Sequence, residues 1–270
     1  MLMRPEYRNI DSDPMNSEKS AKPVNLFWTG GWDSSFRLLQ IVLEEKRAVH
    51  PYYIIYAGRP SFQHEIDAMV KIRTAIGTRY PLSAQLILPT SYSTLEDIND
   101  DDEIMEAFWR ANEERFLTMQ NAWLSKFCKQ HQITDMEYGI IRRPVPQDSR
   151  FYKYLIKENG SSGYIYNPDL YHLPEYTLFR YFRFPIFDYS KKDIEIYARQ
   201  KGWLDILNNS WFCYTPILGR YPCGTCFPCS LVLKSDIRWR IPVVIRILNR
   251  LSLTRPLKWL YRKVKALLSK

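Results

Sequence analysis

The sequence lacks the features of a membrane-spanning or secreted chain. No run of roughly eighteen apolar residues without charge occurs in its 270 residues, so no transmembrane helix is predicted. Residues 1–22 are polar and contain no apolar segment like that of a secretory signal. Their Pro, Asp, Ser and Asn content predicts a disordered leader. We therefore expect a cytosolic location, in which thiols stay reduced.

Several common catalytic and nucleotide-binding motifs are also missing. The chain has only 4 histidines, which argues against a metal site built from imidazoles. It offers no convincing Ser-His-Asp or Cys-His arrangement for nucleophilic catalysis. Neither G-x-x-x-x-G-K-[ST] nor G-x-G-x-x-G occurs. These absences argue against a Walker-type ATPase, a dinucleotide-binding enzyme and a serine or cysteine hydrolase.

Acidic residues are missing from the end of the chain, where basic residues gather. The net charge is +9, and residues 237–270 have no Asp or Glu. Basic residues in that stretch are Arg238, Arg240, Arg246, Arg250, Arg255, Lys258, Arg262, Lys263, Lys265 and Lys270. The basic character therefore belongs to residues 236–270, which we interpret as a basic amphipathic tail.

The tail pattern predicts one or two helices interrupted near Pro256. Its apolar residues share one helical face: Leu257, Leu260, Val264, Leu267 and Leu268. The opposite face carries Lys258, Arg262, Lys265 and Lys270. Such a helix can lie on an anionic membrane surface as a peripheral anchor. Packing on the body or on a protein partner is an equal alternative, and RNA is a third ligand to consider.

Strand and helix patterns alternate along residues 24–201. Short apolar runs predict four strands at residues 24–28, 49–56, 84–88 and 136–141. Helical periodicity predicts helices at residues 35–46, 62–76, 104–131 and 193–201. The alternation predicts an α/β fold with a parallel sheet and crossover helices. Residues 96–103 are acidic, and we expect a solvated loop whose carboxylates favour the next helix N-terminus.

Residues 142–183 have no clear period and are rich in Pro, Gly, Asn and Tyr. We interpret them as an irregular insertion that faces the substrate.

A glycine-rich turn joins the first strand to the first helix. Gly30 and Gly31 allow backbone N–H groups to approach an anion, and the helix N-terminus adds partial positive charge. Hydroxyl donors are available at Thr29, Ser34 and Ser35. Asp33 is placed to orient the loop or to hold Mg²⁺ beside phosphates. We call residues 29–34 the phosphate loop; the alternative is a tight turn without a ligand.

Four of the 5 cysteines lie close together in the sequence, at Cys213, Cys223, Cys226 and Cys229. Four thiolates can complete a tetrahedral Zn²⁺ site, and the intervening Pro and Gly residues suit tight turns. Disulfides, buried free thiols, a redox pair and Fe–S ligation are the alternatives. The fifth cysteine, Cys128, lies on a helical pattern and is expected in the core.

The phosphate loop, Thr-Gly-Gly-Trp-Asp-Ser, resembles the S-G-G-x-D-S signature of PP-loop ATP pyrophosphatases. It departs only at Thr29, which keeps the hydroxyl. Residues 209–214 and 222–229 look like the zinc element of the QueC family, the 7-cyano-7-deazaguanine synthases, with W-x-C-Y followed by C-G-x-C-x-x-C. Residues 56–65 and 184–194 are similar to two further family segments. The resemblance spans about residues 24–235.

The resemblance implies a Rossmann-like (HUP-type) fold over residues 23–235, with a zinc element at residues 209–230. It implies that ATP is split into AMP and pyrophosphate at Thr29, Gly30, Gly31, Asp33, Ser34 and Ser35. Asp33 and Ser34 are its expected catalytic residues, with Mg²⁺ and Zn²⁺ beside ATP as cofactors. The AMP activates a carboxylate oxygen, and ammonia or an amine then accepts the activated group.

Two segments depart from the QueC pattern, and both lie on the substrate side. Residues 111–116 replace P-G-R-N, with Arg115 as a candidate for its Arg, and residues 145–150 only partly match Y-P-D-C-R. A guanidinium can bind a substrate carboxylate with two hydrogen bonds. The candidate substrate-binding residues are therefore Arg59, Arg115, Asp148 and Arg150.

Three functions remain open from the sequence. The first is a QueC-type ligase that makes 7-cyano-7-deazaguanine for queuosine. The second is a related enzyme that joins a deazaguanine-type carboxylate to another acceptor, such as a protein amine, which the altered substrate segments favour. The third is a zinc-containing nucleotide-binding module without catalysis, which the intact Asp33 and Ser34 argue against. A homodimer is compatible with each of them.

Overall fold

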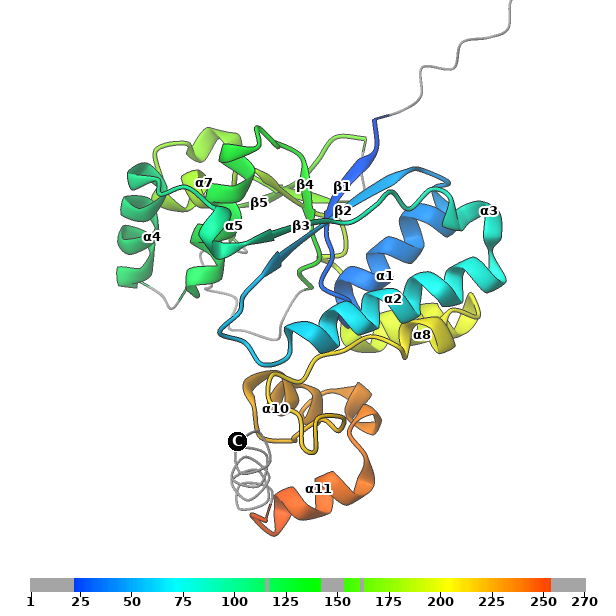
Figure 1. Ribbon diagram of the computed structural model, residues 1–270. Helices are drawn as coiled ribbons and strands as arrows, with labels where there is room; N and C mark the ends of the chain where they lie inside the picture. Colours follow the sequence, from blue (N-terminus) through cyan, green and yellow to red (C-terminus); the bar gives the residue numbers. More distant parts are fainter. Residues whose placement is uncertain (1–21, 115–116, 142–152, 161–162, 254–270) are drawn as a thin grey trace, which may run out of the picture.

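The computed structural model describes residues 22–114, 117–141, 153–160 and 163–253. A seven-stranded sheet forms its centre, in the order β3-β2-β1-β4-β7-β6-β5 (Figure 1). The strands are β1 (Val24–Phe27), β2 (Val49–Ile55), β3 (Ser91–Thr94), β4 (Met136–Tyr138), β5 (Leu155–Lys157), β6 (Tyr164–Tyr166) and β7 (Phe182–Phe184). The first five strands in sheet order, from β3 to β7, run parallel to one another, whereas β6 pairs antiparallel with both β7 and β5. The expected α/β fold is confirmed, with a mixed and largely parallel sheet.

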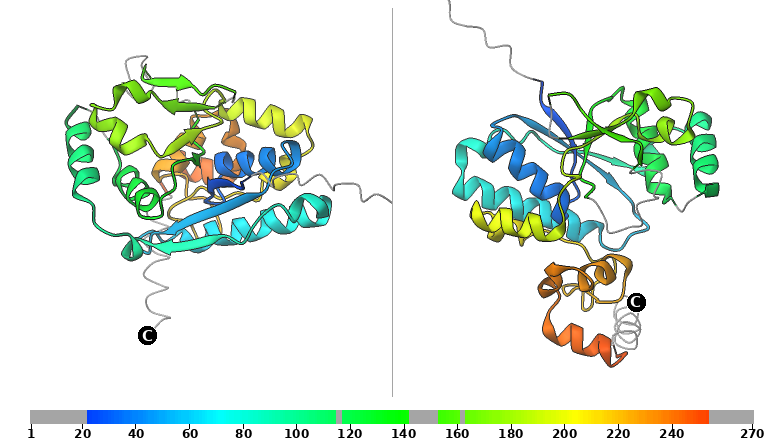
Figure 2. Two further views of the ribbon diagram at one scale, coloured as in Figure 1. Left: turned by 90° about the horizontal axis from the view of Figure 1, so that it is seen from above. Right: turned by 180° about the vertical axis from the view of Figure 1, so that it is seen from behind.

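Helices cover both faces of the sheet (Figures 1 and 2). On one face lie α1 (Trp32–Leu39), which continues as the π-helix η1 (Gln40–Glu44), α2 (Phe62–Arg79), α3 (Pro81–Ala84), α8 (Lys191–Gln200) and α9 (Leu204–Leu207). On the other lie α4 (Asp102–Glu114), α5 (Met119–Gln130) and α7 (Pro174–Phe179). Short 3-10 turns are η2 (Leu95–Asp97) and η3 (Pro168–Leu170).

Successive strand residues point to opposite faces, and this alternation divides the core in two. Leu26 packs with α1, α2 and α8, whereas Phe27 packs with α4, α5 and α7. Strands buried on both faces read as continuous apolar runs, as residues 24–28 do. The run therefore predicted β1 correctly.

Three local expectations were wrong. The third strand is β3, not residues 84–88, of which Ile87 makes only one bridge to Val49. The single helix expected over residues 104–131 is two helices, α4 and α5. The segment expected to be irregular contains β5, β6, α7 and the start of β7. These two added strands make the sheet mixed, because they form an antiparallel hairpin on β7.

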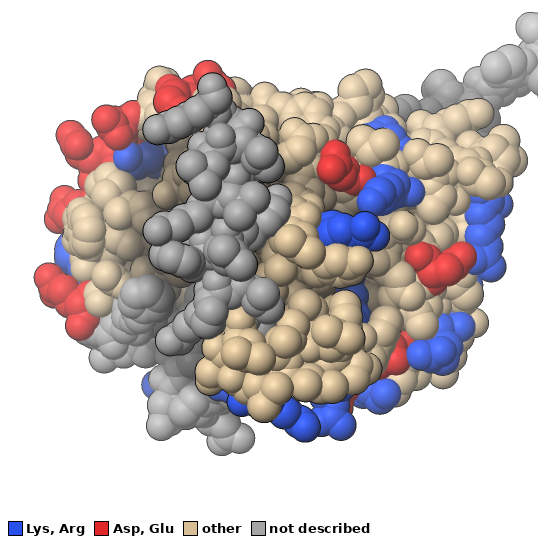
Figure 3. All heavy atoms as spheres, turned by 60° about the horizontal axis from the view of Figure 1, so that its bottom comes forward, with Lys and Arg blue, Asp and Glu red and all other residues tan. Residues whose placement is uncertain are grey.

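The acidic stretch before α4 does more than face solvent. Asp101 accepts a hydrogen bond from the backbone of Ile104, so it caps α4. Lys129 of α5 lies 2.6 Å from Asp101 and 2.7 Å from Glu103. Figure 3 shows acidic side chains gathered along one edge of the molecule. They are therefore remote from the glycine-rich turn at the sheet centre.

A C-terminal lobe lies beneath the carboxyl ends of the parallel strands (Figure 1). We define it as residues 211–253, with α10 (Phe227–Leu233), η4 (Asp236–Arg240) and α11 (Val243–Arg250). Ile237, Ile241 and Ile245 are buried with the cysteines in the core on the α1 side. The leader and the end of the tail, residues 1–21 and 254–270, lie outside the described residues. Within the described ranges, no helix is long and apolar enough to cross a membrane.

Candidate functional site

The phosphate loop lies where the strand order of the parallel sheet reverses. The chain goes from β1 outward to β2 and β3, then crosses back to β4 on the other side of β1. In open α/β sheets, ligands bind in the crevice that this reversal opens at the carboxyl ends of the strands. Gly139, which follows β4, lies against the start of α1. An added Cβ there would be 3.1 Å from the backbone N of Ser34.

A buried ion pair fixes α1 to β4. Arg37 of α1 donates two hydrogen bonds to Glu137 of β4, at 2.6 and 2.8 Å, and it also contacts Glu45. Burial opposes the charge of Arg37, yet the hydrogen bonds with Glu137 raise its pKa above the usual value. Helix α1 and strand β4 are thus held together by a bidentate, charge-assisted contact.

The two glycines of the loop have different structural roles. Gly30 has a φ of +64°, and an added Cβ would lie 2.6 Å from the backbone carbonyl of Glu65 in α2. Only glycine fits both conditions. Gly31 has an ordinary extended φ of −78° and is the N-cap of α1. An added Cβ would there be 3.1 Å from the hydroxyl of Thr29. Gly30 is required by packing, and Gly31 leaves the loop face open.

The first turn of α1 presents hydrogen-bond donors to the crevice. The first backbone N–H groups of a helix have no partner within it, and they carry the positive end of its dipole. Thr29 and Ser34 lie side by side, with their hydroxyl oxygens 3.4 Å apart. Ser35 is fully buried and accepts a hydrogen bond from the indole of Trp28 at 3.0 Å. Ser35 therefore supports the loop from beneath.

Asp33 is paired with a lysine from a distant part of the chain. Lys191 Nζ lies 2.5 and 2.6 Å from the two carboxylate oxygens of Asp33. Lys191 is the first residue of α8, whose N-cap Ser190 and Asp193 form a capping box. Both partners of the pair remain about a quarter exposed. The helix start thus places a cation beside the loop, where it neutralises Asp33 and is available to an anion.

Arg59 follows β2 at the same edge of the sheet. Its guanidinium lies over the ring of Tyr214 at 4.3 Å and is 3.6 Å from the carboxylate of Glu65. Tyr214 is adjacent to Cys213, so Arg59 links the sheet edge to the C-terminal lobe. The other three substrate candidates, Arg115, Asp148 and Arg150, lie outside the described residues.

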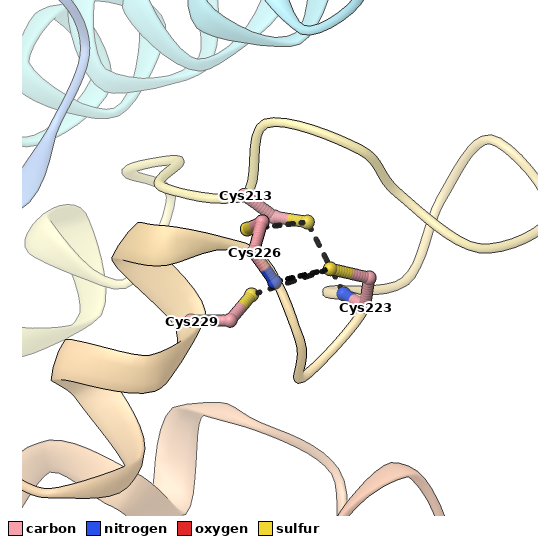
Figure 4. Close-up of side chains that lie close together, drawn as sticks. All are labelled: Cys213, Cys223, Cys226 and Cys229. Atoms are coloured by element: carbon pink, nitrogen blue, oxygen red, sulfur yellow. Dashed lines mark hydrogen bonds between the residues drawn. The ribbon is translucent and has the colours of Figure 1, made fainter. Parts of the chain in front are cut away.

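The four cysteine side chains converge in the lobe (Figure 4), and we call them the four-cysteine cluster. Their sulfur atoms all lie within 4.8 Å of one another. The Cys223–Cys229 and Cys213–Cys226 sulfur pairs are each 3.9 Å apart. A Zn–S distance of 2.3 Å in a tetrahedron requires sulfurs about 3.8 Å apart. Disulfides need about 2 Å, and all four cysteines are free. The cluster could therefore hold one zinc ion.

Backbone donors favour negative charge on these sulfurs. The N–H groups of Thr225 and Cys226 donate to Cys223 Sγ at 3.4 and 3.2 Å, in a turn that Gly224 permits with a φ of +72°. The N–H of Cys223 donates to Cys213 Sγ at 3.1 Å. Hydrogen bonds among the thiols, first of all with Cys213, lower the pKa of Cys226 to about 6 and raise the pKa of Cys229. The backbone N–H donors suit metal-binding thiolates.

The lobe is attached directly to the phosphate loop. The backbone N–H of Trp211 donates to the carbonyl of Gly30 at 2.9 Å. The ring of Trp211 stacks on His64 of α2 at 4.8 Å, and His64 contacts the carbonyl of Gly219 at 2.6 Å. The carbonyl of Gly30 is thus oriented toward the lobe.

Several residues at this site were not among the candidates from the sequence. Lys191 belongs to a segment quoted for the resemblance, so its motif was a usable signal. Gly139 follows the fourth strand directly, and a glycine at that place indicates a close approach of backbone. Arg240 carried no such signal, because its guanidinium contacts the ring of Trp32 in the phosphate loop from a distant part of the sequence.

Comparison with known proteins adds no relative to this description. The chain matches no protein-family model, and no curated protein is similar to it at a significant level. The fold and the four-cysteine cluster therefore stand on the structure itself, and the catalytic assignment rests on the residues.

Proposed function

We propose that this protein is an ATP-dependent ligase that adenylates a carboxylate and releases pyrophosphate, as the QueC family does. The observation that carries the proposal is the hydrogen bond between Trp211 and Gly30, which joins the PP-loop-like turn to the QueC-like cysteine element. Each element alone suits many proteins. Their direct contact at the switch point of a parallel sheet supports one site that uses both.

The chemistry needs a leaving group better than oxide. A carboxylate oxygen attacks the α-phosphorus of ATP, pyrophosphate leaves, and an acyl adenylate forms. Ammonia then attacks the acyl carbon, the C–O bond to AMP breaks, and the products are an amide, AMP and a proton. For a nitrile, a second ATP adenylates the amide oxygen, and loss of AMP and a proton leaves the C≡N bond. In such reactions an enzyme mainly positions groups and stabilises developing charge.

Residues of this chain supply those roles. The N-terminus of α1 and the hydroxyls of Thr29 and Ser34 bind the phosphates that leave. Lys191 adds a positive charge at the same place, 2.5 Å from Asp33 in the present arrangement. When Mg²⁺ accompanies ATP, Asp33 is its candidate ligand, and the ion competes with Lys191 for the carboxylate. Asp33 is thus the residue on which both nucleotide and metal depend.

Zinc in the four-cysteine cluster would hold the lobe together and would take no part in the reaction. All four ligand positions of a tetrahedral ion would be filled by Cys213, Cys223, Cys226 and Cys229, so none remains for substrate. Its contribution is to hold residues 211–214 against the loop and against Arg59.

Product analysis tests the proposal. Protein is incubated with ATP, ammonium and 7-carboxy-7-deazaguanine, and the products are resolved by mass spectrometry. AMP with a product lighter by the mass expected for amide or nitrile supports the QueC-type reaction. ADP as the sole nucleotide product contradicts the proposal.

A second candidate is a QueC-like enzyme with a different acceptor. The sequence departures at residues 111–116 and 145–150 favour it, because they lie in substrate-side segments while the ATP-binding loop is intact. The same incubation without ammonium, but with a protein amine as acceptor, distinguishes the two. AMP release that requires the amine and leaves a mass adduct on the protein supports this second candidate.

A further inference from the structure

Three buried polar atoms lie without hydrogen-bond partners where the phosphate loop meets the C-terminal lobe. They are Arg240 Nη1, Trp32 Nε1 and Ser210 Oγ, each unpaired among the described residues. Unpaired buried polar groups cost free energy and are rare in folded proteins. Three on neighbouring residues point to a ligand that pairs with them.

These residues come from three segments and are in direct contact. The Arg240 guanidinium lies 4.6 Å from the ring of Trp32 and 5.1 Å from the ring of Phe212. Its Nη2 donates to the backbone carbonyl of Ser210 at 2.6 Å. Trp239 packs edge-on against Trp32 at 6.5 Å. Arg240 is therefore held rigidly, and only one side of its guanidinium is used.

Arg240 is half-buried, and its charge has no counter-ion within ion-pair distance among the described residues. Its Nη1 is inaccessible to solvent, and no carboxylate of the described residues lies within ion-pair distance. Burial lowers the pKa of Arg240 to about 10, and the attraction of Asp33 opposes that decrease. A guanidinium with an unpaired, solvent-inaccessible N–H group is costly unless an anion accompanies it in function.

The position of Trp32 relates this cation to the phosphate loop. Trp32 is the first residue of α1, directly before Asp33, and it is only 3% exposed. Asp33 is already neutralised by Lys191. Arg240 therefore leaves the region with an excess of one positive charge beside the helix N-terminus, which favours a bound anion.

We propose that Arg240 and Trp32 form an anion subsite that binds the pyrophosphate part of ATP, on the lobe side of the phosphate loop. The inference rests on the proposed function and extends it. The helix N-terminus binds one phosphate, and the guanidinium and indole N–H donate to the next. A polyphosphate has two adjacent anionic groups for two adjacent subsites, whereas a carboxylate has one. The C-terminal lobe thereby contributes a binding residue to the nucleotide site.

Binding measurements with magnesium pyrophosphate and magnesium ATP test this on the full chain. Each ligand is titrated by calorimetry, and its shift of Tm is measured from the baseline of each variant. Arg240→Gln should weaken pyrophosphate and ATP binding at least tenfold. The exposed neighbour Arg238 is the matched control, and Arg238→Gln should leave both affinities unchanged.

Other outcomes separate the inference from the function on which it rests. If the unsubstituted protein binds neither ATP nor pyrophosphate, the proposed function fails. If it binds both and Arg240→Gln binds equally well, only the subsite is overturned. If Arg240→Gln lowers binding of 7-carboxy-7-deazaguanine but not of pyrophosphate, the subsite belongs to the carboxylate and our assignment is wrong.

A second variant covers the case in which Arg240→Gln does not fold. Trp32→Phe keeps the ring that stacks on Arg240 and removes only the indole N–H. It should weaken pyrophosphate binding severalfold while Tm in the absence of ligand changes little. Unchanged pyrophosphate affinity in folded Trp32→Phe overturns the subsite.

Discussion

The phosphate loop and the four-cysteine cluster are two turns of similar size that hold their shape by different means. The loop is enclosed by the sheet, α1 and α2, and its backbone is in contact with other backbone at Gly30 and Gly139. The cysteine turn contacts mainly side chains, and its Gly224 faces Ile245 and Asn249. Packing therefore fixes the loop, whereas four sulfurs and the ion they could hold fix the cluster.

This difference predicts whether each region loses its chemistry or its folded structure when it is altered. Substitution of a functional group in the phosphate loop can abolish its chemistry and leave its conformation intact, because these groups do not support that conformation. We expect the lobe to depend on its cysteines for folding, since small units with thin cores need a metal or a cross-link. The hydrogen bond from the Trp211 N–H to the Gly30 carbonyl connects the two regions, so that loss of structure in the lobe should also affect the loop.

The largest effect should come from removing the loop's functional group. Asp33→Ala and Gly31→Val should lower ATP-dependent pyrophosphate release at least about 100-fold while the fold is retained, because neither residue supports the core. Pyrophosphate release and circular dichroism measure the two quantities. Asp67→Ala, an exposed carboxylate on α2, is the control and should keep full activity. Normal turnover in Asp33→Ala would remove this residue from the site.

Metal removal should unfold the lobe and leave the sheet intact. We expect one zinc per chain, and the Cys223→Ser/Cys226→Ser double variant or chelation should abolish it, because thiolate–zinc binding is coupled to folding. Elemental analysis counts the metal, and hydrogen exchange locates the loss of protection in residues 211–253. Cys128→Ala should retain zinc, since Cys128 is buried elsewhere in the core. Full zinc retention in the double variant would count decisively against the site.

A pair of glycine substitutions compares the two turns directly. Gly30 and Gly224 both have positive φ, +64° and +72°, but an added Cβ meets the Glu65 carbonyl at 2.6 Å in one and the Ile245 side chain at 3.2 Å in the other. Gly30→Ala should therefore lower the free energy of unfolding by about 2 kcal/mol or more, and Gly224→Ala by about 1 kcal/mol. Urea denaturation measures both. Equal losses would mean that the loop is no more rigid than the lobe.

The smallest effect concerns the outer face of the lobe. Val243, Val244 and Ile247 of α11 are about half exposed, and Arg246 and Arg250 lie on the same helix. Full-length protein should sediment with anionic vesicles more than a truncation after Leu253, and added salt should reduce the difference. The cut is placed there because Ile237, Ile241 and Ile245 are core residues. Equal sedimentation of the two proteins would exclude a membrane role for residues 254–270.

Periodicity and motif spacing sufficed for much of this protein. The apolar run before Gly30 predicted β1, and the cysteine spacing predicted the cluster. The alternation of elements predicted a parallel sheet, and the sheet is largely parallel. These features depend on neighbours within a few residues of one another. Local sequence suffices to predict a strand that is buried on both faces, a glycine with positive φ and a pair of thiols separated by two residues.

Only the tertiary structure decided what faces the loop. Lys191, Arg240 and Trp211 reach it from positions about 160 to 210 residues away along the chain, and no pattern within one segment predicts such contacts. The third strand moved from residues 84–88 to Ser91–Thr94 because pairing with β2, not apolar content, selects the strand. The sequence alone determined which local turns form, whereas the close packing of distant segments decided which charges meet there.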